Sequence, residues 1–375
     1  MDECDFLIIG AGIAGLAAAA ELAPHGKVAL IEQEAHPCFH SSGRSAAIFV
    51  RSYGNEVVQA ITARAGDLFA QAQAEGLFSA FAPPRGVMVV TPKGSPNSGE
   101  APFREYLTAQ EAARLMPCLD AGRIDYGWWE PGACDIDVHA MQTGYLRVLR
   151  AHGGALIAEA PVRSADYRGG RWHVEAGAHL LSAPVVVNAA GAWIDRVASL
   201  FGAHPLGVTP MRRSAVLIDP PGDVDIAGKP MVVDVDETVY FKPDAGRLML
   251  SPADATPVEP HDCWPEDLDL AIAIDRYERL TGNSVSHVHR GWAGLRSFVP
   301  DECPLAGPDP DVPGLHWLGA LGGFGVQTAP ALARLISRQI LDRPREMDVD
   351  LIRAIQPGRI CGRAEVYRPE LSARS

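Results

Sequence analysis

Three glycines and a glutamate near the start of the chain have the types and spacing of a dinucleotide-binding site. The glycines are Gly10, Gly12 and Gly15, in the segment GAGIAG, and Glu32 follows about 20 residues later. Gly10 allows a tight turn, Gly12 lets the backbone approach a pyrophosphate, and Gly15 allows close packing of a helix. A carboxylate at position 32 can accept hydrogen bonds from ribose hydroxyls. The pattern predicts a site for the ADP half of a dinucleotide.

A strand, a helix and a second strand must hold these residues in place. Residues 5–9 form a short apolar run typical of a strand buried on both faces, and the alanine-rich segment 16–22 predicts a helix. Residues 28–31 predict the second strand, which ends at Glu32. The alternative for this series is a βαβ unit with a purely structural role.

Two later segments favour a flavin over a nicotinamide. Residues 185–188 predict a buried strand that runs into the small residues of 189–193. A further strand enters the glycines of 322–325, with a helix expected over 329–341. Glycines followed by a helix N-terminus suit the edge of a reduced flavin, which gains negative charge.

The segment 36–49, HPCFHSSGRSAAIF, is small and polar around one arginine. Short hydroxyls and backbone N–H groups can bond phosphate and flavin edges, and Arg44 offers a planar pair of donors. We therefore expect this segment to approach the cofactor. The alternative is a surface loop in which Arg44 is solvated.

Composition narrows the class of protein. The 375 residues are 47% hydrophobic and 21% charged, and the net charge of −13 argues against a nucleic-acid surface. No apolar run reaches the roughly 18 residues that span a bilayer, and the start lacks a basic signal-peptide region, so we expect a cytoplasmic protein without a membrane span. The seven cysteines contain no CxxC pair, and no metal site is indicated.

The chain resembles the FAD-dependent amine oxidoreductases of the D-amino-acid oxidase superfamily, which includes glycine and sarcosine oxidases, and most closely the bacterial D-arginine dehydrogenases. The motifs GAGIAG, HSSGRSAA, VNAAGAW, RRSA, FKPDAG, WAGLRSFVPD and GGFGVQT occur in family order over about residues 4–340. The resemblance implies FAD, bound covalently or noncovalently, and hydride removal from a carbon that bears an amine. Cys303 invites comparison with the cysteine that holds flavin in some sarcosine oxidases, although its local sequence differs.

The resemblance also implies cofactor contacts in separate parts of the chain. They are Gly10, Gly12, Ile13, Ala14, Gly15, Glu32, Ser41, Ser42, Gly43, Arg44, Ser45, Ala46, Ala47, Val162, Ala190, Gly191, Trp193, Gly322, Gly323, Phe324, Gly325, Val326, Gln327 and Thr328.

Two arginines are candidates for holding a substrate carboxylate. Arg213 begins an alternating strand, and Arg296 lies in the apolar sequence WAGLRSF, an unusual setting for a solvated charge. Both match carboxylate-binding positions of the resembled dehydrogenases. A structural ion pair is the alternative for each, and Arg212 competes with Arg213.

The resemblance assigns pocket positions to Tyr53 and Tyr240, whose phenols can orient a carboxylate without adding charge. Ile48 stands where D-arginine dehydrogenases carry a histidine, and Val87 stands where they carry an acid. With Val50 and Met88 these residues predict an apolar side-chain pocket. The remaining candidate substrate contacts are Gly323 and Gln327, and Arg51 and Arg85 leave an acidic substrate open.

We therefore expect FAD-dependent oxidative deamination of neutral or apolar D-amino acids, with oxygen or a quinone-type compound as electron acceptor. The alternatives are oxidation of D-2-hydroxy acids or of N-methylamino acids, and a flavin-binding protein without turnover.

The expected fold is α/β, with a Rossmann-like FAD-binding domain and an antiparallel-sheet substrate domain. Strand-like runs separated by Pro, Asp and Gly turns predict the second sheet. The expected division assigns 1–80, 140–204 and 301–375 to the FAD-binding domain, and 81–139 and 205–300 to the substrate-binding domain.

Overall fold

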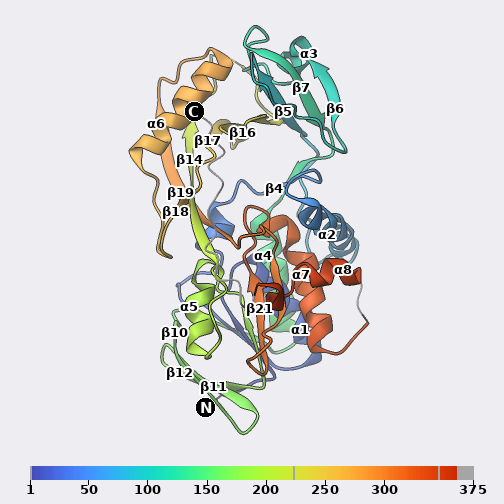
Figure 1. Cartoon of the computed structure of the whole chain (residues 1–375), viewed down its shortest axis with the longest axis vertical. Coiled ribbons are helices and arrows are strands. Elements are labelled where there is room, and N and C mark those ends of the chain that lie inside the picture. The colour runs from blue at the N-terminus through green and yellow to red at the C-terminus, as the bar shows by residue number, and fades with distance from the viewer. Residues whose placement is uncertain (1, 223, 345–346, 361–375) are drawn as a thin grey trace.

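The computed structural model describes residues 2–222, 224–344 and 347–360. Two large sheets dominate it, one in each half of the elongated molecule (Figure 1). The expected α/β architecture is confirmed. Among the described residues, no helix has the combination of length and apolar character that crossing a bilayer requires.

The lower half in Figure 1 contains a six-stranded sheet, parallel except for one edge strand. Its strands in spatial order are β20 (Leu305–Pro308), β21 (Leu315–Gly319), β13 (Val185–Asn188), β2 (Phe6–Ile9), β3 (Val28–Ile31) and β9 (Ala155–Ile157). The central strands β2 and β3 are buried along their whole length, as their continuous apolar sequences predict.

Helices and a small sheet cover the two faces of this sheet. One face packs against helices that share a single apolar core, namely α1 (Ile13–Leu22), α2 (Glu56–Ala74), α4 (Val138–Ala151) and α7 (Gly325–Ile340). The other face packs against α5 (Ile194–Leu200) and a four-stranded sheet of β1 (Asp2–Glu3), β12 (His179–Ala183), β11 (Arg171–Ala176) and β10 (Val162–Arg168). A two-residue turn, Gly169-Gly170, joins β10 to β11, and both glycines have positive φ.

The upper half contains a nine-stranded sheet. Eight of its strands, in spatial order, are β18 (Thr256–Pro257), β14 (Thr209–Ile218), β17 (Arg247–Ser251), β16 (Tyr240–Asp244), β15 (Met231–Asp234), β5 (Val87–Pro92), β7 (Ile124–Glu130) and β6 (Glu105–Thr108), and β19 (Val288–Phe298) pairs with β14. The pairs are antiparallel except β5 with β15, where a strand from a separate part of the chain joins the sheet.

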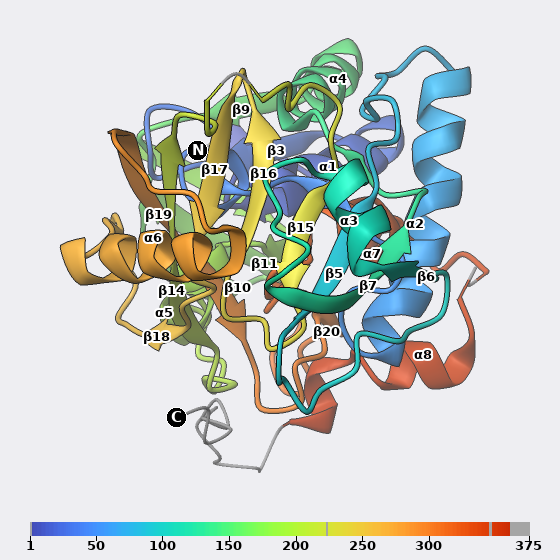
Figure 2. The same ribbon diagram turned by 90° about the horizontal axis from the view of Figure 1, so that it is seen from above.

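The outer face of the nine-stranded sheet packs against α6 (Asp267–Thr281) and α3 (Ala109–Leu115). Figure 2 shows α6 lying across β14 and β17. The inner face is turned toward the six-stranded sheet. The remaining short elements are the paired strands β4 (Ile48–Phe49) and β8 (Cys134–Asp135), the helix α8 (Val349–Arg353), and the 3-10 helices η1 (Ala23–His25), η2 (Ser41–Arg44), η3 (Gly191–Trp193) and η4 (Pro357–Arg359).

The strands of the two large sheets fall on the two sides of the expected domain division, which itself stays a prediction. Its residues 361–375 lie outside the described part of the chain, as does Cys361. The other six cysteines are buried and form no disulfide. The last core helix differs from expectation: α7 begins at Gly325 and not at Ala329, so Pro330 lies inside it.

Candidate active site

A cavity of about 420 Å³ runs between the two sheets. Glu32 lines it at one end, and the inner-face side chains of β14, β16 and β19 line it at the other. The cavity therefore joins the predicted nucleotide site to the predicted carboxylate site.

Close packing explains the glycines of the nucleotide end. A Cβ atom on Gly15 would lie 1.9 Å from the carbonyl oxygen of Gly10, and one on Gly10 would lie 2.5 Å from the carbonyl oxygen of Ala189. Gly10 also has a φ of 98°, which favours glycine. The buried Glu32 carboxylate accepts hydrogen bonds from the backbone N–H groups of Ala11 at 2.6 Å and Glu34 at 3.1 Å.

Most of the expected cofactor contacts line this cavity. They are Gly10, Gly12, Ile13, Ala14, Glu32, Ser41, Ser42, Arg44, Ser45, Ala46, Val162, Ala190, Gly191, Trp193, Gly322, Gly323, Gly325 and Val326. The expected contacts outside the lining are Gly15, Gly43, Ala47, Phe324, Gln327 and Thr328.

Those six residues support the cavity from behind. A Cβ atom on Gly43 would lie 2.4 Å from the carbonyl oxygen of Cys38, and Ala47 has a φ of 48°. Phe324 is the residue before α7, and its carbonyl accepts a hydrogen bond from the Thr328 hydroxyl at 2.9 Å. Their own contacts fix backbone turns behind the cavity, and their contact with the cofactor stays a prediction.

Arg44 lines the cavity, but its guanidinium is bound by other parts of the chain. Its guanidinium donates to the carbonyl oxygens of Cys263 at 2.8 Å and Ala293 at 3.1 Å, and it pairs with Asp262 at 2.5 Å. The guanidinium N–H groups that we expected to bind phosphate thus donate instead to residues of the expected substrate-binding domain, 205–300. Beside it, the Ser41 hydroxyl donates to the Leu295 carbonyl at 2.5 Å, so this segment ties the cofactor side to β19.

The two candidate arginines meet at the far end of the cavity. Arg213 and Arg296 both line it, from the neighbouring strands β14 and β19. Arg213 Nε donates to the Asp254 carbonyl at 2.5 Å, and Arg296 Nη1 donates to the Tyr53 hydroxyl at 3.2 Å. Burial lowers the pKa of Arg213, and the nearby charge of Arg296 lowers it further.

Arg212 points to different partners. Its guanidinium pairs with Glu266 and lies 2.9 Å from the Asp269 carboxylate. Arg212 is absent from the cavity lining. Strand alternation explains the separation, because successive side chains of β14 leave opposite faces of the sheet. The structure therefore brings Arg213, not Arg212, to the cavity.

The two tyrosines flank the arginines. Tyr240 lines the cavity from β16, whereas Tyr53 stands outside the lining and contacts Arg296 through its hydroxyl. Burial opposes its ionisation, but the charges of Arg296 and Arg213 outweigh burial, so the pKa of Tyr240 lies below its ordinary value. The Tyr53 ring packs edge-on against Phe324, with centroids 4.9 Å apart.

The residues of the expected side-chain pocket lie behind the cavity lining. Ile48, Val50 and Val87 pack into an apolar cluster with Tyr240 and Met249, whereas Met88 packs into the core on the outer face of the sheet. β17, β16 and β15 separate β14 from β5, so Val87 lies well away from Arg213 across the sheet.

The apolar side chains that do line this end are Ala46, Ala215 and Met249. The sequence held a signal for Ala215, which follows Arg213 at the two-residue spacing of one strand face. Met249 lies on the neighbouring strand, and no local pattern distinguishes it.

Gln327 and Gly323, the other candidate substrate contacts, differ in their positions. Gln327 is 2% exposed, and its amide bonds the backbone of Val50 and the Thr62 hydroxyl, so it supports the structure from inside and its contact with a substrate stays a prediction. Gly323 lines the cavity, and a Cβ atom there would lie 2.7 Å from Arg296 Nη1. Any side chain at position 323 would displace the Arg296 guanidinium from its observed position.

Several residues at the nucleotide end were missed by the sequence reasoning. His40 lines the cavity, packs against the Trp193 ring at 4.5 Å between centroids, and lies 2.9 Å from the Glu34 carboxylate. The other missed lining residues there include Gln33, Cys38, Phe39, Ala160, Pro161, Arg196, Val197 and Leu200. Burial raises the pKa of the Cys38 thiol to about 12. Cys303 lies outside the lining and accepts a hydrogen bond from Asn55 at 3.5 Å.

A comparison with family models matches residues 5–339 to "FAD dependent oxidoreductase" (DAO). The chain belongs to this DAO family. FAD is therefore its cofactor, and the cavity fits it: one continuous space passes the glycine turn, the N-terminus of α1 with its N-cap Gly12, and the glycines before α7.

Curated DAO relatives match at modest identity. Dimethylglycine dehydrogenase from Mus musculus is 25% identical over 251 residues, which cover 60% of this chain and 28% of that protein. The tRNA 5-methylaminomethyl-2-thiouridine biosynthesis bifunctional protein MnmC from Azoarcus sp. is 26% identical over 402 residues, covering 94% of this chain and 59% of that protein. The chain thus spans less than two thirds of either relative.

Solved DAO-like structures share the fold. Glycine oxidase from Geobacillus kaustophilus superposes with a TM-score of 0.79 at 18% identity, covering 93% of this chain and 97% of that chain. L-proline dehydrogenase from P. horikoshii gives 0.78 at 19% identity, covering 93% and 96%. These relatives carry different substrate names, so the likeness extends to the family and not to the D-arginine dehydrogenases in particular.

Proposed function

We propose that this DAO-family enzyme oxidises D-2-amino acids with neutral side chains. The carbon–nitrogen bond becomes an imine, which water hydrolyses to a 2-keto acid and ammonia. The observation that carries the proposal is the pair of guanidiniums, Arg213 and Arg296, at the end of the FAD cavity.

Charge balance supports a substrate with one net carboxylate. Arg213 has one acidic neighbour, Asp254, whose carboxylate is 3.9 Å from Nε. Among the described residues, Arg296 forms no ion pair, and its hydrogen-bond partner is the Tyr53 phenol. The pair therefore carries one unbalanced positive charge in a partly desolvated place, which a single carboxylate would neutralise.

The surroundings of the remaining space favour a neutral side chain. Ala46, Ala215 and Met249 offer no charge. Arg85, which left an acidic substrate open, pairs with Asp135 at 2.8 Å and donates to the Pro243 carbonyl. Arg51 is exposed, with its guanidinium 4.3 Å from the centre of the Phe103 ring. These contacts argue against an acidic side chain, and the described lining at this end offers no carboxylate to pair with a basic one.

In this proposal the protein's part is positioning. Bound FAD supplies the hydride acceptor for a carbon that bears an amine. Arg296 and Arg213 hold the carboxylate, and Tyr240 orients it by a hydrogen bond. Together they fix the direction of the Cα–H bond, and the small residues at positions 46, 215 and 323 leave room for the reacting carbon. The D configuration rests on the resemblance to the D-amino-acid oxidase superfamily, whose motifs the chain carries in order.

Oxidation of an N-methylamino acid is a second candidate. The likeness to dimethylglycine dehydrogenase favours it. Such a substrate also carries one carboxylate and a neutral amine in its reactive form, so the same arginines would hold it.

Anaerobic reduction of the purified enzyme tests the proposal. The protein is mixed without oxygen with D-amino, L-amino, N-methylamino and D-2-hydroxy acids, and bleaching of the flavin absorbance is followed. Neutral D-amino acids should bleach it fastest. Fastest bleaching by N-methylamino acids would select the second candidate, and bleaching by hydroxy acids alone, or by none, would refute both. Reoxidation by oxygen or by a soluble quinone then identifies the acceptor class.

A further inference from the structure

A short segment without regular structure, residues 50–55, carries Tyr53 between the two sheets. Its position decides where the Tyr53 phenol meets Arg296. Ser52 and Gly54, which flank Tyr53, take no part in the proposed chemistry. The contacts that hold this backbone therefore determine the position of Tyr53.

A buried carboxylate of the nine-stranded sheet binds the backbone of residues 50–55. Glu130 ends β7 and is 2% exposed. Its Oε1 accepts a hydrogen bond from the Arg51 backbone N–H at 2.7 Å, and its Oε2 accepts one from the Ser52 backbone N–H at 3.3 Å. The two oxygens thus bind the backbone N–H groups of the two residues that precede Tyr53. Because Glu130 pairs with Val87 across the sheet, both side chains lie on the inner face.

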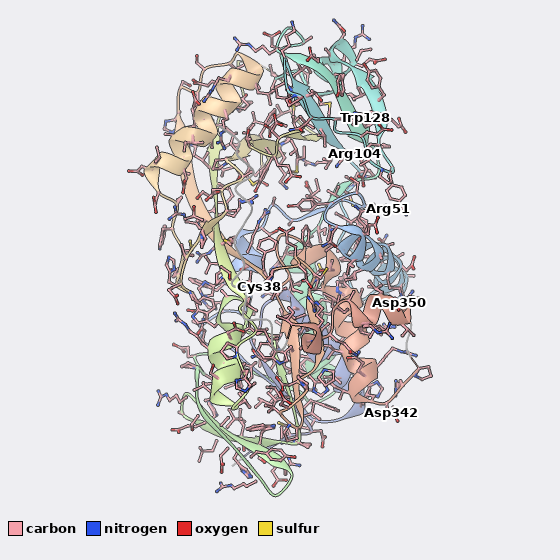
Figure 3. The ribbon with its side chains drawn as sticks, in the orientation of Figure 1. Cys38, Arg51, Arg104, Trp128, Asp342 and Asp350 are labelled. Atoms are coloured by element: carbon pink, nitrogen blue, oxygen red, sulfur yellow. The ribbon has the colours of Figure 1, made fainter. Side chains whose placement is uncertain are left out.

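An arginine completes this contact. Arg104 Nε donates to the Ser52 hydroxyl at 3.2 Å, and its Nη1 donates to the Gly99 carbonyl at 2.7 Å. Burial lowers the pKa of Arg104, while the negative charge of Glu130 opposes that change. Figure 3 shows Trp128, Arg104 and Arg51 in succession from the upper sheet toward α2.

The cofactor side holds the same segment from the other direction. The Gln327 amide on α7 accepts from the Val50 N–H at 3.1 Å. The Gln59 amide on α2 donates to the carbonyls of Ser52 at 3.3 Å and Gly54 at 2.8 Å. The segment is therefore bound by both halves of the molecule, and Glu130 is the acidic side chain that binds it from the nine-stranded sheet.

We propose that Glu130 is a positioning residue, which acts through the backbone of Arg51 and Ser52 to hold the Tyr53 phenol on Arg296. The proposal rests on the proposed function, because it assumes that Arg296 receives the substrate carboxylate. Glu130 itself lines no part of the cavity. Its effect on substrate is therefore indirect.

The chemistry of the contact explains why a glutamate is needed. Two adjacent N–H groups require two acceptor oxygens, which a carboxylate has and an amide lacks. Glu130→Gln keeps the shape but places an NH₂ group against one of the N–H donors. A buried N–H then loses its partner, and the segment loosens.

The test compares Glu130→Gln with Asp234→Asn. Asp234 is a matched control, since it is 4% exposed in the same sheet and accepts from the backbone N–H groups of Thr238 at 2.7 Å and Val239 at 2.8 Å, away from Tyr53. The first measurement is amide hydrogen exchange of the peptide covering residues 50–55 in the FAD-loaded protein. Exchange there should speed up about tenfold in Glu130→Gln and stay unchanged in Asp234→Asn.

The second measurement is the affinity of benzoate, a monocarboxylate probe, followed by its perturbation of the flavin spectrum. Glu130→Gln should weaken benzoate binding about tenfold, and the effect should disappear in a Tyr53→Phe background because the two changes act through one contact. An equal effect of Glu130→Gln with and without the Tyr53 hydroxyl would overturn the proposal, as would unchanged exchange.

The two proposals fail differently. If benzoate does not bind the wild-type protein, the carboxylate site of the proposed function is wrong. The exchange measurement then still decides whether Glu130 holds the Tyr53 segment, because it requires no substrate.

Discussion

The Asp254 carboxylate lies 3.9 Å from Nε of Arg213, and the Asp254 backbone carbonyl accepts a hydrogen bond from the same nitrogen. Arg296, one strand away, contacts a neutral phenol and no carboxylate among the described residues. The two guanidiniums therefore differ in how far the protein neutralises them. Arg213 has an acidic neighbour in Asp254, whereas the positive charge of Arg296 has no such partner among the described residues and can pair with a ligand carboxylate.

This inequality predicts that Arg296 dominates substrate binding. Arg296→Met should cost about 3 kcal/mol of transition-state binding, or about a hundredfold in kcat/KM, because a charge-assisted contact is lost. The FAD content should stay near that of the wild type. Steady-state kinetics and the ratio of flavin to protein absorbance measure both quantities. Loss of flavin would instead assign Arg296 to the cofactor.

Arg212→Lys is the matched control. This neighbour on β14 is bound to Glu266 and Asp269, outside the cavity. Its replacement should lower the melting temperature and change kcat/KM far less than Arg296→Met. Equal losses in the two variants would mean that the arginines act only through stability.

Tyr240 predicts a pH dependence of ligand binding. Its pKa is below the ordinary value because the charges of Arg296 and Arg213 outweigh burial. A bound carboxylate neutralises part of that positive charge and so raises the pKa of Tyr240. Ligand affinity should then be highest below the pKa of the free enzyme and fall as pH rises through it, when the phenolate forms and repels the carboxylate. Benzoate titrations from neutral to alkaline pH measure this fall, and Tyr240→Phe should abolish it.

Met249 predicts how the side-chain space can be enlarged. Met249 is 2% exposed and stands between the cavity and the cluster that contains Val50 and Val87. Met249→Ala should raise kcat/KM for D-phenylalanine relative to D-alanine, while destabilising the fold by about 2–5 kcal/mol. Met88→Ala removes an equally buried methionine from the opposite face of the sheet, so it should cost similar stability without changing that ratio. An unchanged ratio in Met249→Ala would remove Met249 from the substrate site.

The nucleotide turn predicts a sharp difference between two glycines. Gly15→Ala would bring a methyl group to 1.9 Å from the Gly10 carbonyl oxygen, so it should abolish FAD retention or folding. Gly132→Ala is the control, because nothing lies within 4 Å of its Cβ position. It should yield a normally loaded yellow protein. Full FAD content in Gly15→Ala would mean that α1 can move away from β2 at little cost.

Local sequence patterns were sufficient for the first sheet and for the arginines. The apolar runs at residues 6–9 and 28–31 form strands buried throughout, as continuous hydrophobicity predicts. Alternation along β14 placed Arg213 and Arg212 on different faces, although the sequence did not say which face met the cofactor. Arg296 was identified by its apolar neighbours, and its strand delivers it to the cavity.

The remaining site depends on contacts between distant residues, which no local pattern reports. Val50 and Gln327 are 277 positions apart in the chain, and Arg51 and Glu130 are 79 apart. Ile48, Val50 and Val87 lie behind the cavity lining because their order across the sheet, not their hydrophobicity, decides which side chains reach the cavity, so their role in a side-chain pocket stays a prediction. The start of α7 was missed because Gly322 and Gly323 suggested a loop that extended into Gly325.

The Gly169-Gly170 turn between β10 and β11 offers an attachment point for a reporter or an electrode linker. Nothing lies within 4 Å of the Cβ position of either glycine. The hairpin projects at the end of the molecule opposite α3 and β6 (Figure 1). Exposed turns of small residues tolerate inserted sequence, since few contacts are lost when they lengthen. A short peptide inserted there would label the protein while leaving both walls of the flavin cavity intact.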